Sequence, residues 1–463
     1  MDALSNFLTW INDYILWGPP ILILLVGTHV FLTIRTRGIQ RHIGKAIKMS
    51  VTKDADAEGD ISQFGALTTA LAATIGTGNI VGVSAAIALG GPGAVLWCWL
   101  TGVFGIATKY GEGLLAVKYR VKTSDGTMLG GPMYALERGL GKKWLAVLFA
   151  IFASIAAFGI GSSTQANSLT EMVSTQFGIS PWISSIAITI LTAIVVLGGV
   201  QLISKVCTIL VPFMAIFYVI GCAVILGMNA SYLGETVKLI FSHAFSAKSI
   251  TGGFIGSTIM SAARYGVARG LFSNESGLGS APIAAAAAQT RNSVRQALVS
   301  MTGTFWDTVV VCAMTGLVIV SSVIKGGEAL SMVDGVRLQG GALTNAAFGQ
   351  LGTIGQVVLT IGLATFVFST ILGWSYYGER CVEYLLGKKG IMPYKVIYVA
   401  TVFLGGVMSF GIVWQLADAL NALMAIPNLI ALIALSGVIV KETKKYLWDK
   451  NLDEVDNTPI PKV

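Results

Sequence analysis

Residues 74–82 read TIGTGNIVG, and their glycines, threonines and asparagine interrupt an apolar stretch that is long enough to cross a bilayer. Such a segment leaves backbone N–H and C=O groups without helical partners. Lipid cannot replace those partners, so the segment must be buried in protein or line a cavity. Freed N–H groups at the start of a helix suit a carboxylate, and freed carbonyl groups suit a cation. A small zwitterion such as an amino acid needs both kinds of group.

In this first segment we expect backbone amide donors at Gly76, Thr77 and Gly78, because glycine allows a ligand to approach the main chain closely. Asn79 adds a side-chain amide that can serve an ion or a ligand. The alternative is that these small residues only pack helices together, which is common in membranes.

A second interruption, FSNESG at residues 272–277, lies in an apolar run at 252–287. That run would form ~54 Å of unbroken helix, against a hydrocarbon core of ~30 Å. We expect the carbonyl groups of Phe272 and Ser273 to face an ammonium group and the Phe272 ring to close the pocket. Asn274 belongs to an Asn-x-x-Gly pattern that both interruptions share, and it is included among the expected ligand contacts.

Polar side chains in two further apolar runs extend this prediction. Ser369 and Thr370 carry adjacent hydroxyl groups, which are hard oxygen ligands suited to Na⁺; alternatively they bond back to their own helix. Trp374 is expected either to gate the pocket or to anchor a helix end at the membrane interface. Gln165 is expected either to hydrogen-bond a ligand or to lie at the outer boundary of its helix.

Two acidic residues are expected inside the membrane. Asp307 lies about 15 Å along its apolar run, and Glu275 lies at the second interruption. Ionisable groups at this depth are functional candidates by default. The alternative is that they pair with Arg264 or Arg269 and hold the interrupted segment in shape.

Other reactive side chains give no catalytic pattern. Lys109 and Glu112, three residues apart, are expected to form a structural ion pair. The five cysteines and three histidines show no paired or metal-ligand spacing, and no phosphate-binding loop motif occurs. We therefore assign no catalytic residue, and the sequence predicts neither an enzyme nor an ATP-driven pump.

The elements that must position these groups are predicted to be transmembrane helices. The chain is 54% hydrophobic and 12% charged, against roughly 25% charged residues in soluble domains. Each of its apolar runs reaches the ~20 residues that a membrane-spanning helix needs. The sequence thus predicts an all-α integral membrane protein with about eleven transmembrane helices. The runs are 15–34, 63–90, 93–117, 144–172, 181–200, 206–228, 252–287, 297–323, 347–377, 393–412 and 416–440.

The net charge of +8 is explained by topology. If the N-terminus is outside, 24 of the 31 Lys and Arg residues lie in inward loops and 4 in outward loops. This is the positive-inside pattern, and it places the C-terminus inside. We expect no nucleic-acid partner, and the N-terminus has no basic region typical of a cleaved signal peptide.

The loops are too short to fold separately, so a single transmembrane domain over 1–463 is expected. The interruptions lie in the second and seventh runs, five spans apart, and because five is odd this predicts two inverted repeats of five helices each after one extra N-terminal helix. The expected segments are 1–62 (extra helix and cytoplasmic loop), 63–228 (first repeat), 252–440 (second repeat) and 441–463 (cytoplasmic tail).

Longer motifs resemble one known family. Residues 62–102, SQFGALTTALAATIGTGNIVGVSAAIALGGPGAVLWCWLTG, resemble the alanine or glycine:cation symporters, and so do ARGLFSNESGLGSAPIAAAAA and FSTILGWSYYGER. The resemblance extends over nearly the whole chain. Leu96 and Cys98 beside Trp97 depart from the Phe and Met expected there, which we attribute to packing.

The resemblance implies the five-plus-five inverted-repeat fold of the neurotransmitter:sodium symporters. It implies that the Gly78 amide meets the substrate carboxylate, and that carbonyl groups near Ala72 and Ile75 form a sodium site with Ser369 and Thr370. It further implies Na⁺-coupled uptake of alanine and glycine across the cell (plasma) membrane by alternating access. Na⁺ would be co-transported, without an organic cofactor.

Two alternatives remain at this point. One is proton-coupled amino acid symport through Glu275 or Asp307, and the other is an ion channel. The expected partners are the small amino acid and membrane lipid. A monomeric state is compatible with the sequence.

Overall fold

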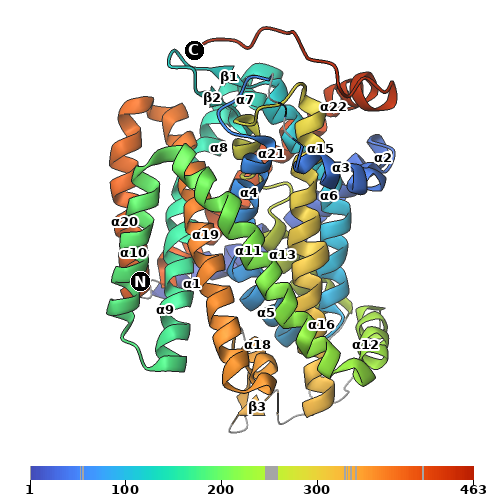
Figure 1. Cartoon of the computed structure of the whole chain (residues 1–463), viewed down its shortest axis with the longest axis vertical. Coiled ribbons are helices and arrows are strands. Elements are labelled where there is room, and N and C mark those ends of the chain that lie inside the picture. Colours follow the sequence, from blue (N-terminus) through green and yellow to red (C-terminus); the bar gives the residue numbers. More distant parts are fainter. Residues whose placement is uncertain are drawn as a thin grey trace.

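The computed structural model describes residues 2–52, 54, 57–245, 259–327, 330, 332–333, 336–338, 341–408 and 411–463. Figure 1 shows a helical bundle whose long helices run roughly side by side. The described strands form two short antiparallel hairpins. In one, Val121–Lys122 (β1) pairs with Met128–Leu129 (β2); in the other, Met332–Val333 (β3) pairs with Val336–Arg337 (β4).

The helices of the first half, in chain order, are α1 (Asp2–Ile11), η1 (Asn12–Leu16), α2 (Pro19–Arg35), η2 (Ile39–His42), α3 (Ile43–Ser50), α4 (Gln63–Thr74), η3 (Gly78–Gly82), α5 (Val83–Gly90), α6 (Ala94–Lys118), α7 (Pro132–Tyr134), η4 (Ala135–Gly139), α8 (Lys143–Ala156), η5 (Ala157–Ser163), α9 (Thr164–Phe177), α10 (Pro181–Leu197), α11 (Gly199–Met228), η6 (Ala230–Tyr232) and α12 (Leu233–Phe245). Those of the second half are α13 (Ile259–Asn274), α14 (Pro282–Ala286), α15 (Ser293–Thr304), η7 (Phe305–Cys312), α16 (Ala313–Gly326), α18 (Gly341–Phe348), η8 (Gly349–Leu351), α19 (Thr353–Leu386), η9 (Lys388–Gly390), α20 (Ile391–Val407), α21 (Gly411–Ala434), α22 (Ser436–Thr443) and η10 (Lys444–Trp448).

Seven of the described helical segments are long and apolar enough to cross a membrane, or eight if α4 and the bent segment after it count as one span. The predicted membrane-spanning helical class is therefore confirmed. The count of eleven, the orientation and the inverted repeat stay predictions. α6 is long enough to span, but its buried Lys109 and Glu112 lower its hydropathy, and α10 has 17 residues.

Both predicted interruptions are present. α4 ends at Thr74, Ile75 is extended, and the chain resumes as a π-helical turn at Gly78 after a bend of 49°. We call residues 75–77 the first break. α13 ends at Asn274, and α14 begins only at Pro282.

We call residues 275–281 the second break. Its backbone turns through three residues with positive φ, namely Glu275 (54°), Gly277 (91°) and Gly279 (90°). Two of these are glycines, which adopt this conformation without strain. The left-handed conformation of Glu275 is uncommon for a residue with a side chain.

The two breaks are brought together by the way that their helices pack. α6 packs along α13 and α15, while α4 packs against α11 and α19. The π-helical turns η3 and η7 contact each other, and α13 contacts η3. The centre of the bundle is thus built from α4, α6, α13, α15 and α19.

One end of the molecule is covered by the chain's last residues, 449–463, which we call the tail (Figure 1). Asn292 donates its side-chain amide to the carbonyl oxygen of Glu454 at 2.9 Å. Further along, the backbone N–H of Lys122 donates to the carbonyl oxygen of Pro461 at 2.9 Å. The tail therefore links the start of α15 to the β1–β2 hairpin.

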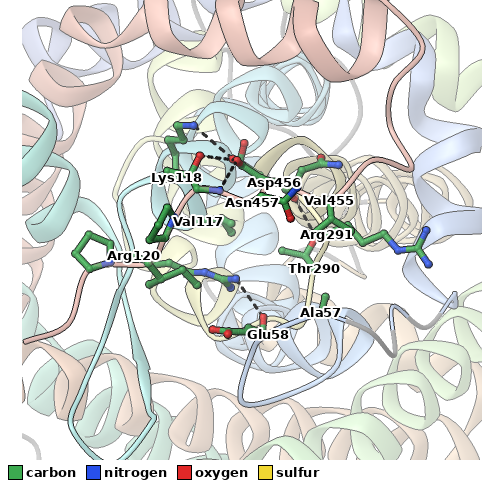
Figure 2. A pocket seen from close by; sticks show the side chains of 16 residues that line it. Ala57, Glu58, Val117, Lys118, Arg120, Thr290, Arg291, Val455, Asp456 and Asn457 are labelled. Atoms are coloured by element: carbon green, nitrogen blue, oxygen red, sulfur yellow. Dashed lines mark hydrogen bonds and ion pairs between the residues drawn. The ribbon is translucent and has the colours of Figure 1, made fainter.

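Figure 2 shows a pocket of about 310 Å³ beneath the tail. In its wall, Lys118 pairs with Glu442 at 3.1 Å and with Asp456 of the tail at 3.5 Å. Burial raises the pKa of Asp456, but the hydrogen bond from Thr458 and the Lys118 charge outweigh burial and hold that pKa below its ordinary value. The tail contact is therefore stabilised at neutral pH and weakens as pH falls through the lowered pKa.

Candidate functional site

The two breaks approach each other at Gly78, which begins η3 directly after the first break and faces the last turn of α13, directly before the second break. A Cβ atom added to Gly78 would lie 3.3 Å from the Cα atom of Ser273 and 3.5 Å from the Phe272 ring. The 3.3 Å distance is shorter than nine in ten of the contacts that real Cβ atoms make. Only glycine therefore fits this approach without a shift of the second chain segment.

The predicted amide donors of the first break differ in their bonding. The N–H of Gly76 donates to the side-chain oxygen of Asn79 at 2.9 Å, and the N–H of Thr77 donates to that of Gln165 at 3.4 Å. Gly78 is the first residue of η3, so its N–H has no partner within its own helix. Of the three donors, Gly78 is the one best placed for an incoming anion.

Gln165 lies at the first break. Its side-chain oxygen accepts from Thr77, its amide donates to the Ile160 carbonyl at 3.1 Å, and the residue is buried. The alternative that Gln165 lies at an outer boundary is wrong. Gln165 lies in the first turn of α9, directly after the π-helical turn η5, and its side chain is buried in the bundle.

Asp307, in η7, joins the two breaks. Its fully buried carboxylate accepts hydrogen bonds from Asn79 at 2.7 Å, from Ser273 at 3.0 Å and from Thr308 at 2.6 Å. All of these donors are neutral side chains. The carboxylate therefore ties the start of η3 to the end of α13.

The alternative that the buried acids pair with Arg264 or Arg269 is wrong. Arg264 lies 3.8 Å from the carboxylate of Asp13, and the guanidinium of Arg269 lies 5.8 Å from the centre of the Phe272 ring. Both arginines belong to α13, but their side chains lie on the part of the helix that precedes the break.

Glu275 is instead held by neutral groups. One carboxylate oxygen accepts from the indole N–H of Trp374 at 3.0 Å, and the other accepts from the hydroxyl of Ser280. Trp374 is 1% exposed and packs directly on Gly161. The alternative that Trp374 is an interfacial anchor is therefore wrong, since its ring contacts the second break.

The predicted Lys109–Glu112 ion pair is confirmed, with 3.8 Å between the charged atoms. Glu112 also has a role that sequence reasoning missed. Its other oxygen accepts from the backbone N–H groups of Gly277 at 3.0 Å and Gly279 at 3.1 Å, and from Asn428 at 2.7 Å. The sequence indicated only the pairing with Lys109, because these glycines lie more than 160 residues away.

The residues predicted to hold sodium lie where α4 meets α19. The hydroxyl of Thr370 donates to the carbonyl oxygen of Ile75 at 3.3 Å, and Ala72 is buried one turn earlier on α4. The hydroxyl of Ser369 bonds back to the Phe366 carbonyl of its own helix at 2.9 Å. Hydroxyl and carbonyl oxygens are the hard ligands that Na⁺ requires, and the hydroxyl groups can rotate.

Phe272 and Asn274, the remaining predicted ligand contacts, differ in their surroundings. Phe272 is half-buried, and its ring lies 6.4 Å from that of Trp17, edge to face. Asn274 is buried, accepts from the backbone N–H of Ser276 at 2.9 Å and faces Thr101 at 3.4 Å. In this structure Asn274 shapes the second break, while Phe272 and Ser273 lie in the last turn of α13, where carbonyl groups lack helical partners.

A bundle of apolar helices whose centre holds two backbone breaks, freed amide and carbonyl groups and buried carboxylates is typical of a secondary transporter in the cell membrane. The sequence matches the model of the sodium:alanine symporter family over residues 1–459, and the chain belongs to this family. It is therefore a multi-pass membrane transporter and not an enzyme, as the sequence predicted.

Two relatives match along almost their whole length. The chain is 51% identical over 453 residues to the sodium/alanine symporter AgcS of Methanococcus maripaludis, covering 96% of this chain and 98% of the relative. It is 50% identical over 464 residues to an uncharacterized transporter of Haemophilus influenzae, covering 99% and 100%.

Among solved structures, MhsT in complex with L-phenylalanine is similar in fold. Its TM-score is 0.56 at 14% sequence identity, with 83% of this chain and 98% of that chain covered. At this identity the likeness concerns the fold alone.

Proposed function

We propose that this protein couples inward Na⁺ movement to the uptake of a small neutral amino acid, with alanine and glycine as substrates. The observation that carries the proposal is the meeting of the two breaks at Gly78, with the Ile75 carbonyl and the Thr370 hydroxyl 3.3 Å apart beside it. Membership of the sodium:alanine symporter family and the name of the Methanococcus relative support Na⁺ and alanine as the transported pair.

The substrate carboxylate binds at the start of η3. The Gly78 N–H is the first donor, and the N–H groups of Gly76 and Thr77 join when Asn79 and Gln165 release them. The helix dipole of η3 and α5 adds to this attraction.

The ammonium group of the substrate faces the Phe272 and Ser273 carbonyls in the last turn of α13. Trp374 beside Glu275 and the close approach of Gly78 to Ser273 favour a substrate with a small side chain. Asn274 contributes by holding the second break in the conformation that presents these carbonyls.

Na⁺ binds between α4 and α19 through the Ala72 and Ile75 carbonyls and the Ser369 and Thr370 hydroxyls. Ile75 is directly followed by the amide donors for the substrate, so an ion that fixes its carbonyl also orders the carboxylate site. Binding at one site then favours binding at the other, and by linkage the effect is reciprocal. The membrane potential contributes ~2.3 kcal/mol per charge per 100 mV to the inward movement.

Alternating access follows from rocking of one helix group against the other around these sites. We place the N-terminus outside, the C-terminus inside, and two inverted repeats of five helices after one extra helix, within one domain. The transported pair is Na⁺ and the amino acid, without an organic cofactor, and the protein works in contact with lipid, with a monomer as the simplest unit.

A second candidate is proton-coupled symport. It is favoured by Glu275 and Asp307, whose carboxylates are buried and accept hydrogen bonds only from neutral side chains in the described structure. Either group could carry a proton across without disturbing an ion pair. An ion channel has less support, because the described residues between the two breaks are packed closely.

Uptake of radiolabelled alanine by proteoliposomes tests the proposal. An inward Na⁺ gradient should drive accumulation, and replacing Na⁺ by K⁺ should abolish it. Equal accumulation in both salts would contradict sodium coupling. Accumulation that follows an imposed pH gradient would favour the proton-coupled candidate, and a large current without a fixed ratio to alanine would favour a channel.

A further inference from the structure

A basic stretch runs over residues 35–52, at the end of the molecule that carries the tail (Figure 1). It contains no acidic residue. Its exposed cations are Arg35, Arg37, Arg41, Lys45 and Lys48. Within the amphipathic helix α3, Lys45 and Lys48 lie three residues apart and so share one exposed face, while Ala46 and Met49 are buried against the protein.

An apolar groove of about 380 Å³ begins at Ile47, Ser50 and Val51, which precede and follow Lys48 in the sequence. It is formed by α3, α4, α11 and η7. Val51 at its start is 70% exposed and Ile216 on its wall is 60% exposed, so the groove opens outward, where the bilayer lies. Its volume is within the range of sites that hold small molecules, ~300–1,000 Å³.

The groove offers no free hydroxyl group to a polar ligand. Ser50 and Thr68 are the two hydroxyl residues in its lining, and each donates to a carbonyl of its own helix, at 2.7 Å to Ile47 and at 2.9 Å to Phe64. The remaining lining is aliphatic or aromatic. Its occupant must therefore be apolar where it lies in the groove.

We propose that this groove is a binding site for one anionic phospholipid. An acyl chain lies along the groove between α4 and α11, and the phosphate lies against Lys45 and Lys48. The argument is one of charge complementarity, since the charged residues of α3, which contributes Ile47 and Ser50 to the groove, are the cations Lys45 and Lys48, and anionic headgroups are attracted to basic amphipathic helices at the membrane surface.

The position of the groove gives the lipid a way to act on transport. Its inner end reaches Ile75, whose carbonyl belongs to the proposed sodium site, and its wall includes Trp306 and Val310, which lie on η7 one residue before and three residues after Asp307. An acyl chain bound in the groove contacts the first break from the side that faces the lipid. Because α4 bounds the groove, a movement of α4 relative to α11 changes the fit, and the lipid favours one conformation. This consequence rests on the proposed function, whereas the binding site does not.

Native mass spectrometry of the purified full-length protein tests the binding. The protein is exposed to mixed micelles with equal phosphatidylglycerol and phosphatidylcholine, and the retained lipid is identified. The unaltered protein should retain one phosphatidylglycerol in preference. The Lys45→Gln/Lys48→Gln variant should lose this preference by about fivefold for each charge removed. The matched control Lys441→Gln/Lys444→Gln, with the same spacing at exposed positions of α22 and η10, should keep it.

A second variant tests the groove itself. Ala215→Phe places a ring in the groove and should reduce retention of both lipids, whereas Ala187→Phe on the exposed face of α10 should not. Size-exclusion profiles check that each variant is folded. Equal retention of both lipids by the unaltered protein, or equal behaviour of the lysine variant and its control, would overturn the proposal. A dimer that Ala215→Phe dissociates would assign the groove to a second copy of the chain instead.

Uptake measurements separate the binding of the lipid from its effect on transport. If alanine uptake occurs, proteoliposomes with phosphatidylglycerol should transport faster than those of phosphatidylcholine alone, and Ala215→Phe should remove the difference. Preferential retention with lipid-independent uptake would overturn the effect on transport and leave the site standing. Preferential retention without any uptake would contradict the proposed function and not the lipid site.

Discussion

Single atoms decide whether the two breaks can approach. Gly78 has no side chain, and a Cβ there would press on the main chain of Ser273 at 3.3 Å. Gly82, four residues later and at the end of the same turn, would place a Cβ in ordinary contact, 3.9 Å from the Arg269 side chain. The chain thus offers a matched pair of glycines that differ in what they face.

Gly78→Ala should reduce alanine uptake at least tenfold, because it separates the breaks and covers the N–H that meets the carboxylate. Gly82→Ala should leave uptake within about twofold, since both substitutions have the same effect on helix propensity, of roughly 1 kcal/mol. Initial rates in proteoliposomes, corrected for the amount of folded protein, measure the difference. Equal loss in the two variants would contradict the special position of Gly78.

Ser369 and Thr370 also differ in what they face. Thr370→Ala removes the hydroxyl that contacts Ile75, and should raise the Na⁺ concentration for half-maximal uptake more than Ser369→Ala, whose hydroxyl is bonded to its own helix. Thr370→Ser should restore the Na⁺ response. An unchanged Na⁺ dependence in Thr370→Ala would remove this residue from the sodium site.

Residue types predicted much of this site, because interruptions at Gly76–Asn79 and Phe272–Ser273 are visible in the sequence itself. Their bonding was not predictable in the same way. Asp307 lies about 30 residues from one break and more than 200 from the other, so only the fold shows that it joins them. For the same reason, only the fold shows that Glu112 contacts the second break and that Trp374 is buried beside Glu275.

At the scale of elements, the second break is held by α6. Glu112 accepts two backbone N–H groups of the break, and its other oxygen faces the buried ammonium of Lys109 at 3.8 Å. Within the described structure neither of the two facing atoms has a hydrogen-bond partner. Losing one charge of such a pair costs more than losing both, because the remaining charge stays buried.

Glu112→Gln should therefore destabilise the protein by about 3–5 kcal/mol. The double variant Lys109→Met/Glu112→Gln should recover part of that loss, since a glutamine oxygen can still accept from Gly277 and neither charge of the pair remains. Thermal unfolding followed by size-exclusion chromatography measures both. A double variant as unstable as the sum of its single substitutions would contradict the coupling.

At the scale of the whole molecule, the tail covers the end at which basic residues gather. Ser293 lies in the wall of the pocket beneath it, is buried, and its hydroxyl has no partner in the described structure. The five native cysteines are all buried. A thiol placed at position 293 therefore reports whether the tail is in place.

Ser293→Cys should react slowly with maleimide in the full chain and at least tenfold faster after deletion of residues 451–463, because the tail then no longer covers the pocket. Labelling rates at neutral pH, with the unaltered protein as background, measure this effect. Equal rates with and without the tail would show that it does not close this end.

The general architecture was largely predictable, since apolar runs of ~20 residues and a strong bias of Lys and Arg require a helical membrane protein. The sequence could not predict that α8 and α9, or α15 and α16, are joined through π-helical turns, because these depend on tertiary packing. It also gave no sign that the tail docks, because residues 449–463 are polar and have no periodic pattern.

The central claim is that the break after α4 couples the ion to the substrate. Calorimetric titration of the purified protein with alanine, in Na⁺ and again in K⁺ at equal ionic strength, tests it most directly. We predict an affinity at least ~5-fold higher in Na⁺, the lower end of typical coupling between sites. Thr370→Ala should remove this difference while keeping the affinity in K⁺. The same alanine affinity in both salts would contradict the account.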